Sequence, residues 1–219
     1  MNRHSKSALS IVAFISRIFS VVYLSGCSYS KLLTSFSSQT GIRKVLNEEQ
    51  QQIFDSFRQD YERGERKKYL LHGVTGSGKT EVYIEMIDYV LTQGKEAIVL
   101  IPEIALTYQT LKRFYERFGD VVSVMNSKLS QGERYDQFER AKNGEVKIMI
   151  GPRSALFTPF PNLGIIIIDE EHEGSYKSET MPKFHARTVA EWIAKDTNAS
   201  LVLGSATPSL ESFYEVEQG

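Results

Sequence analysis

Four consecutive isoleucines, at positions 165–168, constrain the fold of this chain more than any other feature. A strand presents alternate side chains to opposite faces, so an unbroken apolar run must be buried on both faces. Strands of this kind are typical of parallel sheets that carry helices on both sides. A second continuous apolar run, at residues 97–101, gives the same indication.

Helical periodicity and turn residues divide the chain from Leu46 onwards into alternating helices and strands. The asparagine–glutamine pair Asn47 and Gln50, and the pair Ser130 and Glu133, are capping boxes that mark helix starts. Strands are expected at 69–72, 97–101, 121–125, 146–150, 164–168 and 200–204, and helices at 47–63, 79–93, 107–118, 130–143 and 185–195. This alternation predicts a doubly wound, mostly parallel α/β sheet.

A glycine-rich segment between an expected strand and an expected helix fits the P-loop pattern in full: Gly73-Val74-Thr75-Gly76-Ser77-Gly78-Lys79-Thr80. Its backbone N–H groups and the following helix N-terminus can bind phosphate oxygens. Lys79 can reach the β- and γ-phosphates, and the Thr80 hydroxyl can bind Mg²⁺. The alternative is a chance match in a turn, but the flanking elements are those the chemistry needs. ATP and Mg²⁺ are therefore the expected cofactors.

An acidic cluster, Asp169-Glu170-Glu171-His172, follows the isoleucine strand directly. Ligands of open α/β sheets gather at the carboxyl ends of the strands. Asp169 is therefore expected to hold the Mg²⁺ that Thr80 contacts, and Glu170 to orient or deprotonate the attacking water. An isolated acidic triplet is usually a solvated turn, whereas the buried strand and the P-loop together favour a catalytic role for Lys79, Asp169 and Glu170.

The P-loop and the acidic cluster together resemble the nucleotide site of superfamily 2 helicases, with residues 169–172 as the D-E-x-H box. Residues 204–208 resemble motif III, and the resemblance implies a coupling role for His172, Ser205 and Thr207. An ordinary turn with serine and threonine caps would give a similar pattern at 204–208. Residues 46–50 resemble the upstream element in which a glutamine, here Gln50, contacts adenine.

Longer runs resemble a narrower group, the first motor lobe (a RecA-like domain) of the PriA family of replication-restart DNA helicases, also called primosomal protein N′. These runs are PEIALT (102–107), RSALF (153–157), PFPNLG (159–164), DEEHEGSYK (169–177), FHAR (184–187) and GSATPSLES (204–212). The resemblance extends from Leu46 to about Ser212. It implies ATP-driven unwinding of forked or single-stranded DNA at stalled forks, with other primosome proteins as partners.

The same resemblance indicates where DNA would be bound. Residues 102–107 and 151–157 would place N–H groups, hydroxyls and a cation at strand ends, where a phosphodiester backbone could lie. Residues 173–187 combine aromatic and basic side chains, as DNA-binding loops do. The alternative is a surface loop whose aromatic residues cover the core. The candidate DNA contacts are Thr107, Arg153, Tyr176, Lys177 and Arg187.

The charge distribution divides the chain near Val45. Residues 1–45 hold six Lys or Arg and no Asp or Glu, which leaves 26 − 6 = 20 basic and 27 acidic residues for the remainder. We expect residues 1–45 to be an unassigned segment and residues 46–219 to be the ATP-binding domain. The segment Leu24-Ser25-Gly26-Cys27 resembles a lipoprotein signal, and a transit peptide or an unstructured segment would also fit. The apolar stretch before it is too short to span a membrane.

Composition excludes some classes of protein. The single cysteine, Cys27, excludes a disulfide framework and a cysteine-cluster zinc site. The net charge of −1 means that DNA binding must depend on local clusters. Residues 126–128 (Asn-Ser-Lys) and Pro152 differ from the family pattern. The second motor lobe that the family pattern includes is not found in this sequence. We therefore expect a cytoplasmic, nucleoid-associated fragment with weak activity; the alternatives are a binding module without turnover and an exported lipoprotein.

Overall fold

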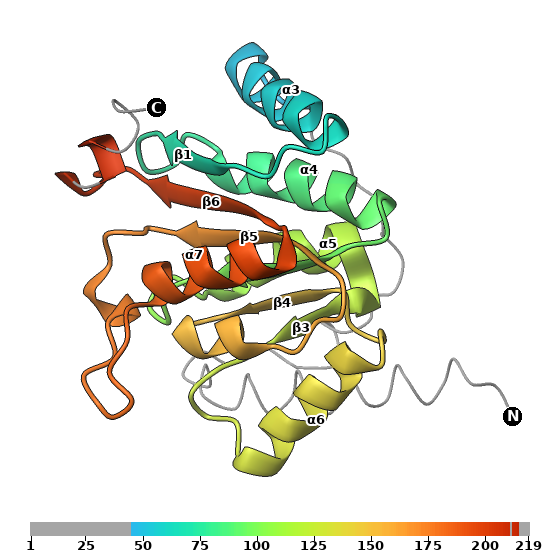
Figure 1. Ribbon diagram of the computed structural model, residues 1–219, viewed down its shortest axis with the longest axis vertical. Helices are drawn as coiled ribbons and strands as arrows, with labels where there is room; N and C mark the ends of the chain where they lie inside the picture. The colour runs from blue at the N-terminus through green and yellow to red at the C-terminus, as the bar shows by residue number, and fades with distance from the viewer. Residues whose placement is uncertain (1–44, 211, 215–219) are drawn as a thin grey trace, which may run out of the picture.

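The computed structural model describes residues 45–210 and 212–214. The signal-like pattern that ends at Cys27 therefore lies outside the described residues. Six strands form one sheet in the order β1-β6-β5-β2-β4-β3, and every neighbouring pair is parallel (Figure 1). The strands are β1 (Lys68–His72), β2 (Glu96–Leu100), β3 (Val122–Val124), β4 (Ile148–Gly151), β5 (Leu163–Asp169) and β6 (Ser200–Ser205).

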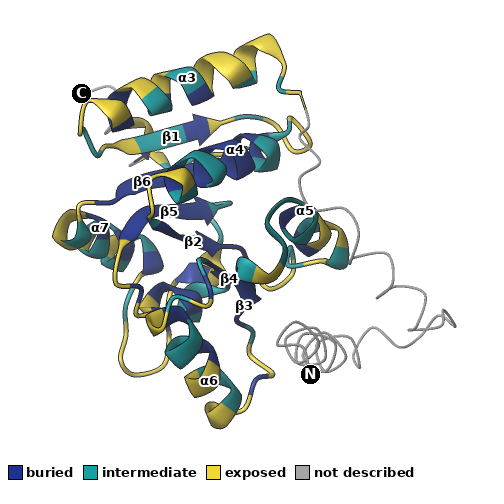
Figure 2. Cartoon of the chain, turned by 90° about the vertical axis from the view of Figure 1, so that its right-hand side faces the viewer, coloured by how far each residue is buried: buried dark blue, intermediate teal, exposed yellow. Residues whose placement is uncertain are grey.

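Helices cover both faces of this sheet, as Figure 2 shows from the side. The α-helices of the described residues include α3 (Glu48–Glu62), α4 (Lys79–Thr92), α5 (Tyr108–Phe118), α6 (Gln131–Lys142) and α7 (Ala186–Thr197). Short 3₁₀ turns follow or precede strands: η1 (Gly119–Val121), η2 (Arg153–Phe157) and η3 (Gly174–Tyr176). Helices α3, α4 and α5 pack into one core, with α3 against α4, while α6 and α7 pack into the other core. The predicted doubly wound α/β fold is confirmed.

The isoleucines of β5 show why the sheet needs two covered faces. Ile165 and Ile167 belong to the core on the α4 side, and Ile166 and Ile168 to the core on the α7 side. All four side chains are at most 1% exposed. The run that constrained the fold is therefore shared equally between the two cores.

The helix boundaries follow the expected capping residues. Gln50 N donates to Asn47 Oδ1 (2.8 Å) and Asn47 N to Gln50 Oε1 (3.0 Å), which completes the first capping box. Ser130 and Glu133 form the second. The strand expected at 146–150 begins later, at Ile148. Val146 N instead donates to the Arg140 carbonyl (3.4 Å), so Val146 lies in the turn that follows α6.

The strand order sets which loops share an edge of the sheet. Because all strands are parallel, the loops that follow them emerge at the same edge. The loops after β1, β6 and β5 are neighbours, and they carry the P-loop, motif III and the acidic box. The loops after β2 and β4 lie further along. Within the described part of the chain, no helix is long and apolar enough to cross a membrane.

The double burial of β5 leads to a stability prediction. We expect Ile167→Ala to lower the free energy of unfolding by about 3 kcal/mol, because a fully buried isoleucine leaves a cavity when truncated. Urea unfolding followed by far-UV circular dichroism measures this. The matched control is Ile53→Ala on α3, where the side chain is 38% exposed and the expected cost is under about 1 kcal/mol. Equal losses in the two variants would contradict the burial argument.

Candidate functional site

The P-loop curls between β1 and α4 with two glycines in left-handed conformations. Gly76 has φ +83° and Gly78 has φ +86°, backbone angles that residues with a Cβ rarely adopt. Gly73 N donates to the Ser205 carbonyl (3.1 Å), which joins the loop to the end of β6. The loop therefore has the form that aims backbone N–H groups at phosphate.

Gln50 contacts this loop directly. Its Nε2 donates to the Ser77 carbonyl (2.9 Å), while its Oε1 completes the capping box of α3. A Cβ added to Gly78 would overlap Gln50 Nε2. The glutamine that sequence reasoning linked to adenine is therefore packed against the P-loop.

Lys79 is the buried cation of the site. Its side chain is 9% exposed, and its Nζ donates to the Gly73 carbonyl (2.6 Å) and the Val74 carbonyl (3.4 Å). The same ammonium lies 3.8 Å from Glu170 Oε1. The P-loop and the acidic box are thus in contact, as the sequence predicted from two distant motifs.

Asp169 is held by a residue of the P-loop helix. The Tyr83 hydroxyl, on α4, donates to Asp169 Oδ1 (3.0 Å). Burial raises the pKa of Asp169 above its usual value; the Tyr83 hydrogen bond lowers it, and nearby Glu170 raises it. Glu170 itself has φ +49°, a strained backbone conformation of the kind that gathers at active sites.

The donors available for Mg²⁺ are of the right chemistry. Mg²⁺ prefers hard oxygen ligands, usually one or two carboxylates together with phosphate oxygens and water. Asp169 supplies a carboxylate that is already oriented by Tyr83, and Thr80 supplies a hydroxyl at the start of α4. Among the described residues, no group of three or more His, Cys, Asp or Glu gathers as a metal site.

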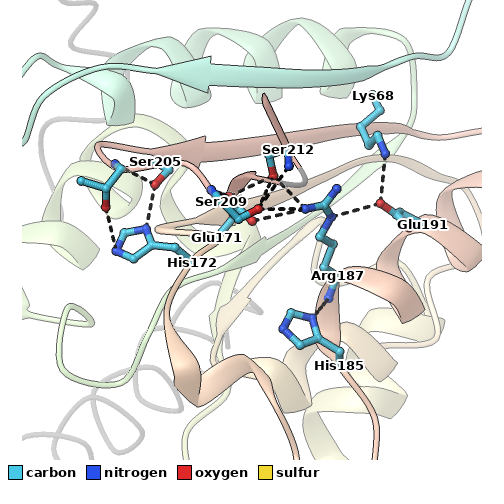
Figure 3. A network of polar contacts seen from close by, with 10 residues as sticks. Lys68, Glu171, His172, His185, Arg187, Glu191, Ser205, Ser209 and Ser212 are labelled. Carbon is cyan, nitrogen blue, oxygen red and sulfur yellow. Dashed lines mark hydrogen bonds and ion pairs between the residues drawn. The ribbon is translucent and has the colours of Figure 1, made fainter. Parts of the chain in front are cut away.

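The three predicted coupling residues lie together beside the acidic box. Figure 3 labels two of them, His172 and Ser205. His172 Nδ1 lies 2.7 Å from Ser205 Oγ and 3.7 Å from Glu170 Oε2. His172 Nε2 lies 3.4 Å from Thr207 Oγ1, and Thr207 N donates to Ser205 Oγ (3.0 Å). The histidine therefore connects the end of β5 to the loop after β6.

A buried polar network surrounds Glu171, as Figure 3 also shows, and was not predicted from the sequence. Glu171 Oε1 accepts from Ser209 N (2.9 Å) and from Ser212 Oγ (3.0 Å), and Arg187 Nη1 lies 3.6 Å from Oε2. Arg187 also donates to Ser212 Oγ (2.7 Å) and to Glu191 Oε1 (3.2 Å). The available signal was the spacing of Ser209 and Ser212, which suits a serine cap.

Two residues that were predicted to contact DNA, Tyr176 and Arg187, have side chains that are largely buried in this structure. The Tyr176 side chain is only 1% exposed, because its ring fills the core and its hydroxyl donates to the carbonyls of Leu100 (3.0 Å) and Asp169 (2.7 Å). Arg187 is engaged by the Glu171 network and its side chain is 12% exposed. Neither side chain is available to an incoming strand of DNA.

The other predicted DNA contacts lie after three neighbouring strands. Thr107 is the exposed N-cap of α5 and accepts from Thr110 N (3.3 Å). Arg153 Nη1 donates to the Ser175 carbonyl (2.7 Å) and the Lys177 carbonyl (3.0 Å), so it holds the loop after β5. Lys177 is exposed. These residues follow β2, β4 and β5, and therefore share the edge that carries the P-loop.

An aromatic contact at the same edge was not foreseen as a pair. The rings of Phe157 and Phe184 meet edge to face with centroids 5.4 Å apart, and Phe157 is half-exposed. This contact joins η2 to the loop that leads into α7. Sequence reasoning named both runs, RSALF and FHAR, but could not show that they meet.

The chain is similar in sequence to replication restart proteins. It is 53% identical to the replication restart protein PriA of Bacillus subtilis (strain 168) over 174 residues, covering 80% of this chain and 22% of that protein. It is 44% identical to the PriA protein of Treponema pallidum (strain Nichols) over 193 residues, covering 86% of this chain and 29% of the relative. The chain therefore spans less than a third of the length of these relatives.

Structural comparisons agree on the fold. The chain resembles RecG bound to a three-way DNA junction (TM-score 0.58, 23% identity, 84% of this chain and 24% of that one). It also resembles the Pyrococcus furiosus Hef helicase domain (TM-score 0.51, 19% identity, 77% of this chain and 35% of that one). The predicted resemblance to PriA is confirmed by the sequence matches. Residues 43–210 match the model of the family described as "Type III restriction enzyme, res subunit", and the chain belongs to this family.

Proposed function

We propose that residues 46–219 are the ATP-binding domain of an ATP-dependent DNA helicase that acts in replication restart, and that residues 1–45 are a separate segment. One observation carries the proposal: the P-loop lysine lies 3.8 Å from the acidic box, and that box is bonded through His172 to Ser205. These contacts connect the proposed nucleotide site to the loop after β6. The sequence similarity to replication restart proteins supplies the biological process.

Each residue of the site has a distinct task in this proposal. The P-loop N–H groups and the Lys79 ammonium bind the phosphates. Thr80 and Asp169 hold Mg²⁺, which when bound neutralises charge on the phosphate oxygens. Glu170 orients the attacking water, and its carboxylate lies 3.8 Å from the Lys79 ammonium. Gln50 supports the loop from the side of α3.

DNA would lie over the loops after β5, β2 and β4. Thr107 and Lys177 are exposed there, and Arg153 fixes the loop that carries Lys177. Forked or single-stranded DNA is the proposed substrate, and primosome proteins are the proposed partners. Because β5 lies between the strands of the two sites, the loop that follows it is the shortest connection from DNA to nucleotide.

Removal of the P-loop ammonium tests the nucleotide site. We expect Lys79→Ala to weaken binding of a fluorescent ATP analogue at least about tenfold, since a hydrogen bond to a charged group contributes about 1.5–3 kcal/mol. The control Lys142→Ala removes an exposed lysine at the end of α6 and should bind as the unchanged chain does. Unchanged affinity in Lys79→Ala would refute the proposed function.

Two further variants separate a buried arginine from a DNA contact. Arg187→Met should leave the salt dependence of DNA affinity unchanged but destabilise the fold by about 3 kcal/mol, because Glu171 then keeps a buried, unpaired charge. Lys177→Ala should reduce the slope of log affinity against log salt by about 1, with little loss of stability. Fluorescence anisotropy at several salt concentrations, with urea unfolding, measures both. The reverse pattern would restore Arg187 as a phosphate contact.

A further inference from the structure

Tyr83 lies at the centre of the site, yet the proposed function gives it no task of its own. It stands one helical turn after Lys79 on α4, and its side chain is 1% exposed. Its hydroxyl donates to Asp169 Oδ1 (3.0 Å), which is the only hydrogen bond of that hydroxyl within the described residues. A buried tyrosine normally places its hydroxyl on whatever acceptor the core offers. Here the acceptor is the carboxylate proposed to hold the cation.

The backbone of the neighbouring strand, at Gly204, leaves room for the Tyr83 hydroxyl. Asp169 on β5 is in register with Gly204 on β6. A Cβ built on Gly204 would overlap the Tyr83 hydroxyl, and it would lie 2.8 Å from Tyr83 Cζ and 3.4 Å from Asp169 Oδ1. Gly204 has an ordinary negative or extended φ, so the backbone conformation does not demand glycine there. The demand comes from the space that the hydroxyl occupies.

The electrostatic surroundings of Tyr83 and Asp169 keep the tyrosine hydroxyl as a hydrogen-bond donor to the carboxylate. Burial raises the pKa of Tyr83 well above its usual value, so the hydroxyl keeps its proton at neutral pH. Burial also raises the pKa of Asp169, and the Tyr83 hydrogen bond opposes that shift. Lys79 and Glu170 are the charged groups beside the carboxylate, with opposite effects on it. The hydroxyl is thus a neutral, permanent donor to a carboxylate that has lost most of its solvent.

We propose that Tyr83 is a positioning residue that orients the Asp169 carboxylate for Mg²⁺, and that Gly204 is glycine in order to admit the Tyr83 hydroxyl. The inference rests on the proposed function and deepens it. Partners that orient a metal-binding carboxylate typically change metal affinity 10- to 100-fold when removed. The effect on Mg²⁺ is therefore large enough to measure. A tyrosine that merely fills the core would be replaced by phenylalanine without any effect on Mg²⁺.

The variant Tyr83→Phe removes only the hydroxyl, so it isolates this effect from packing. The same change at Tyr89, six residues further along the same helix, is the matched control, because Tyr89 packs against the rings of Phe54 and Tyr61. A fluorescent ATP analogue is titrated into each chain in EDTA, and then at increasing Mg²⁺ concentrations. Thermal unfolding of each variant is measured in parallel.

We expect Tyr83→Phe to bind the nucleotide in EDTA within twofold of the unchanged chain, and to need about tenfold more Mg²⁺ for the half-maximal effect. Tyr89→Phe should match the unchanged chain in both measurements. If Tyr83→Phe shows an unchanged Mg²⁺ requirement while Lys79→Ala loses nucleotide, the inference fails and the proposed function stands. If Lys79→Ala binds nucleotide normally, the proposed function itself fails.

The role of Gly204 has an independent test that does not need nucleotide. Gly204→Ala should lower the melting temperature, because the new Cβ overlaps the Tyr83 hydroxyl. Adding Tyr83→Phe to Gly204→Ala should recover part of that loss, since phenylalanine vacates the overlapped position. A double variant no more stable than Gly204→Ala would show that the hydroxyl is not what excludes a side chain at 204.

Discussion

The parallel pairing of β5 with β6 is the constraint on which the rest of the site depends. The two strands are in register from Ile165 beside Ser200 to Asp169 beside Gly204. The apolar part of this ladder is buried in both cores, so the pairing cannot slip by one residue without exchanging the faces of every side chain. The last rung therefore delivers Asp169, and with it Glu170 and His172, to a fixed place beside the P-loop.

The strand order then separates two kinds of chemistry along one edge. The loops after β1, β6 and β5 hold the ammonium, hydroxyl and carboxylate groups that suit a nucleotide. The loops after β2 and β4 hold Thr107 and Arg153, groups that suit a phosphodiester backbone. The loop after β5 contacts both sets, through His172 on one side and through the Arg153 bonds on the other. The proposed nucleotide-binding loops and the proposed DNA-binding loops are therefore connected by direct contacts through the loop after β5.

Much of this was predictable because local and long-range signals agreed. The isoleucine run, the capping boxes and the P-loop each have a mechanism that acts within a few residues, and the structure has the elements where those mechanisms place them. The edge rule for parallel strands predicted that the acidic box lies near the P-loop, whereas the contact of Lys79 with Glu170 itself was not predicted. The burial of Tyr176 and Arg187 could not be predicted from the sequence, for one common reason. In a sequence, an aromatic or basic residue that faces solvent cannot be distinguished from one that turns inward. The burial of Tyr176 and Arg187 depends on distant partners, the Leu100 carbonyl and Glu171 respectively.

Gln50 illustrates how two requirements can narrow the choice of a single residue. The start of α3 would accept glutamate as readily as glutamine, because only an acceptor for Asn47 N is needed. The other end of the same amide faces the carbonyl oxygen of Ser77. A carboxylate there would oppose one acceptor with another and add negative charge beside a loop built for anions. Of the two residues that suit the helix start, only the neutral amide also suits its neighbour.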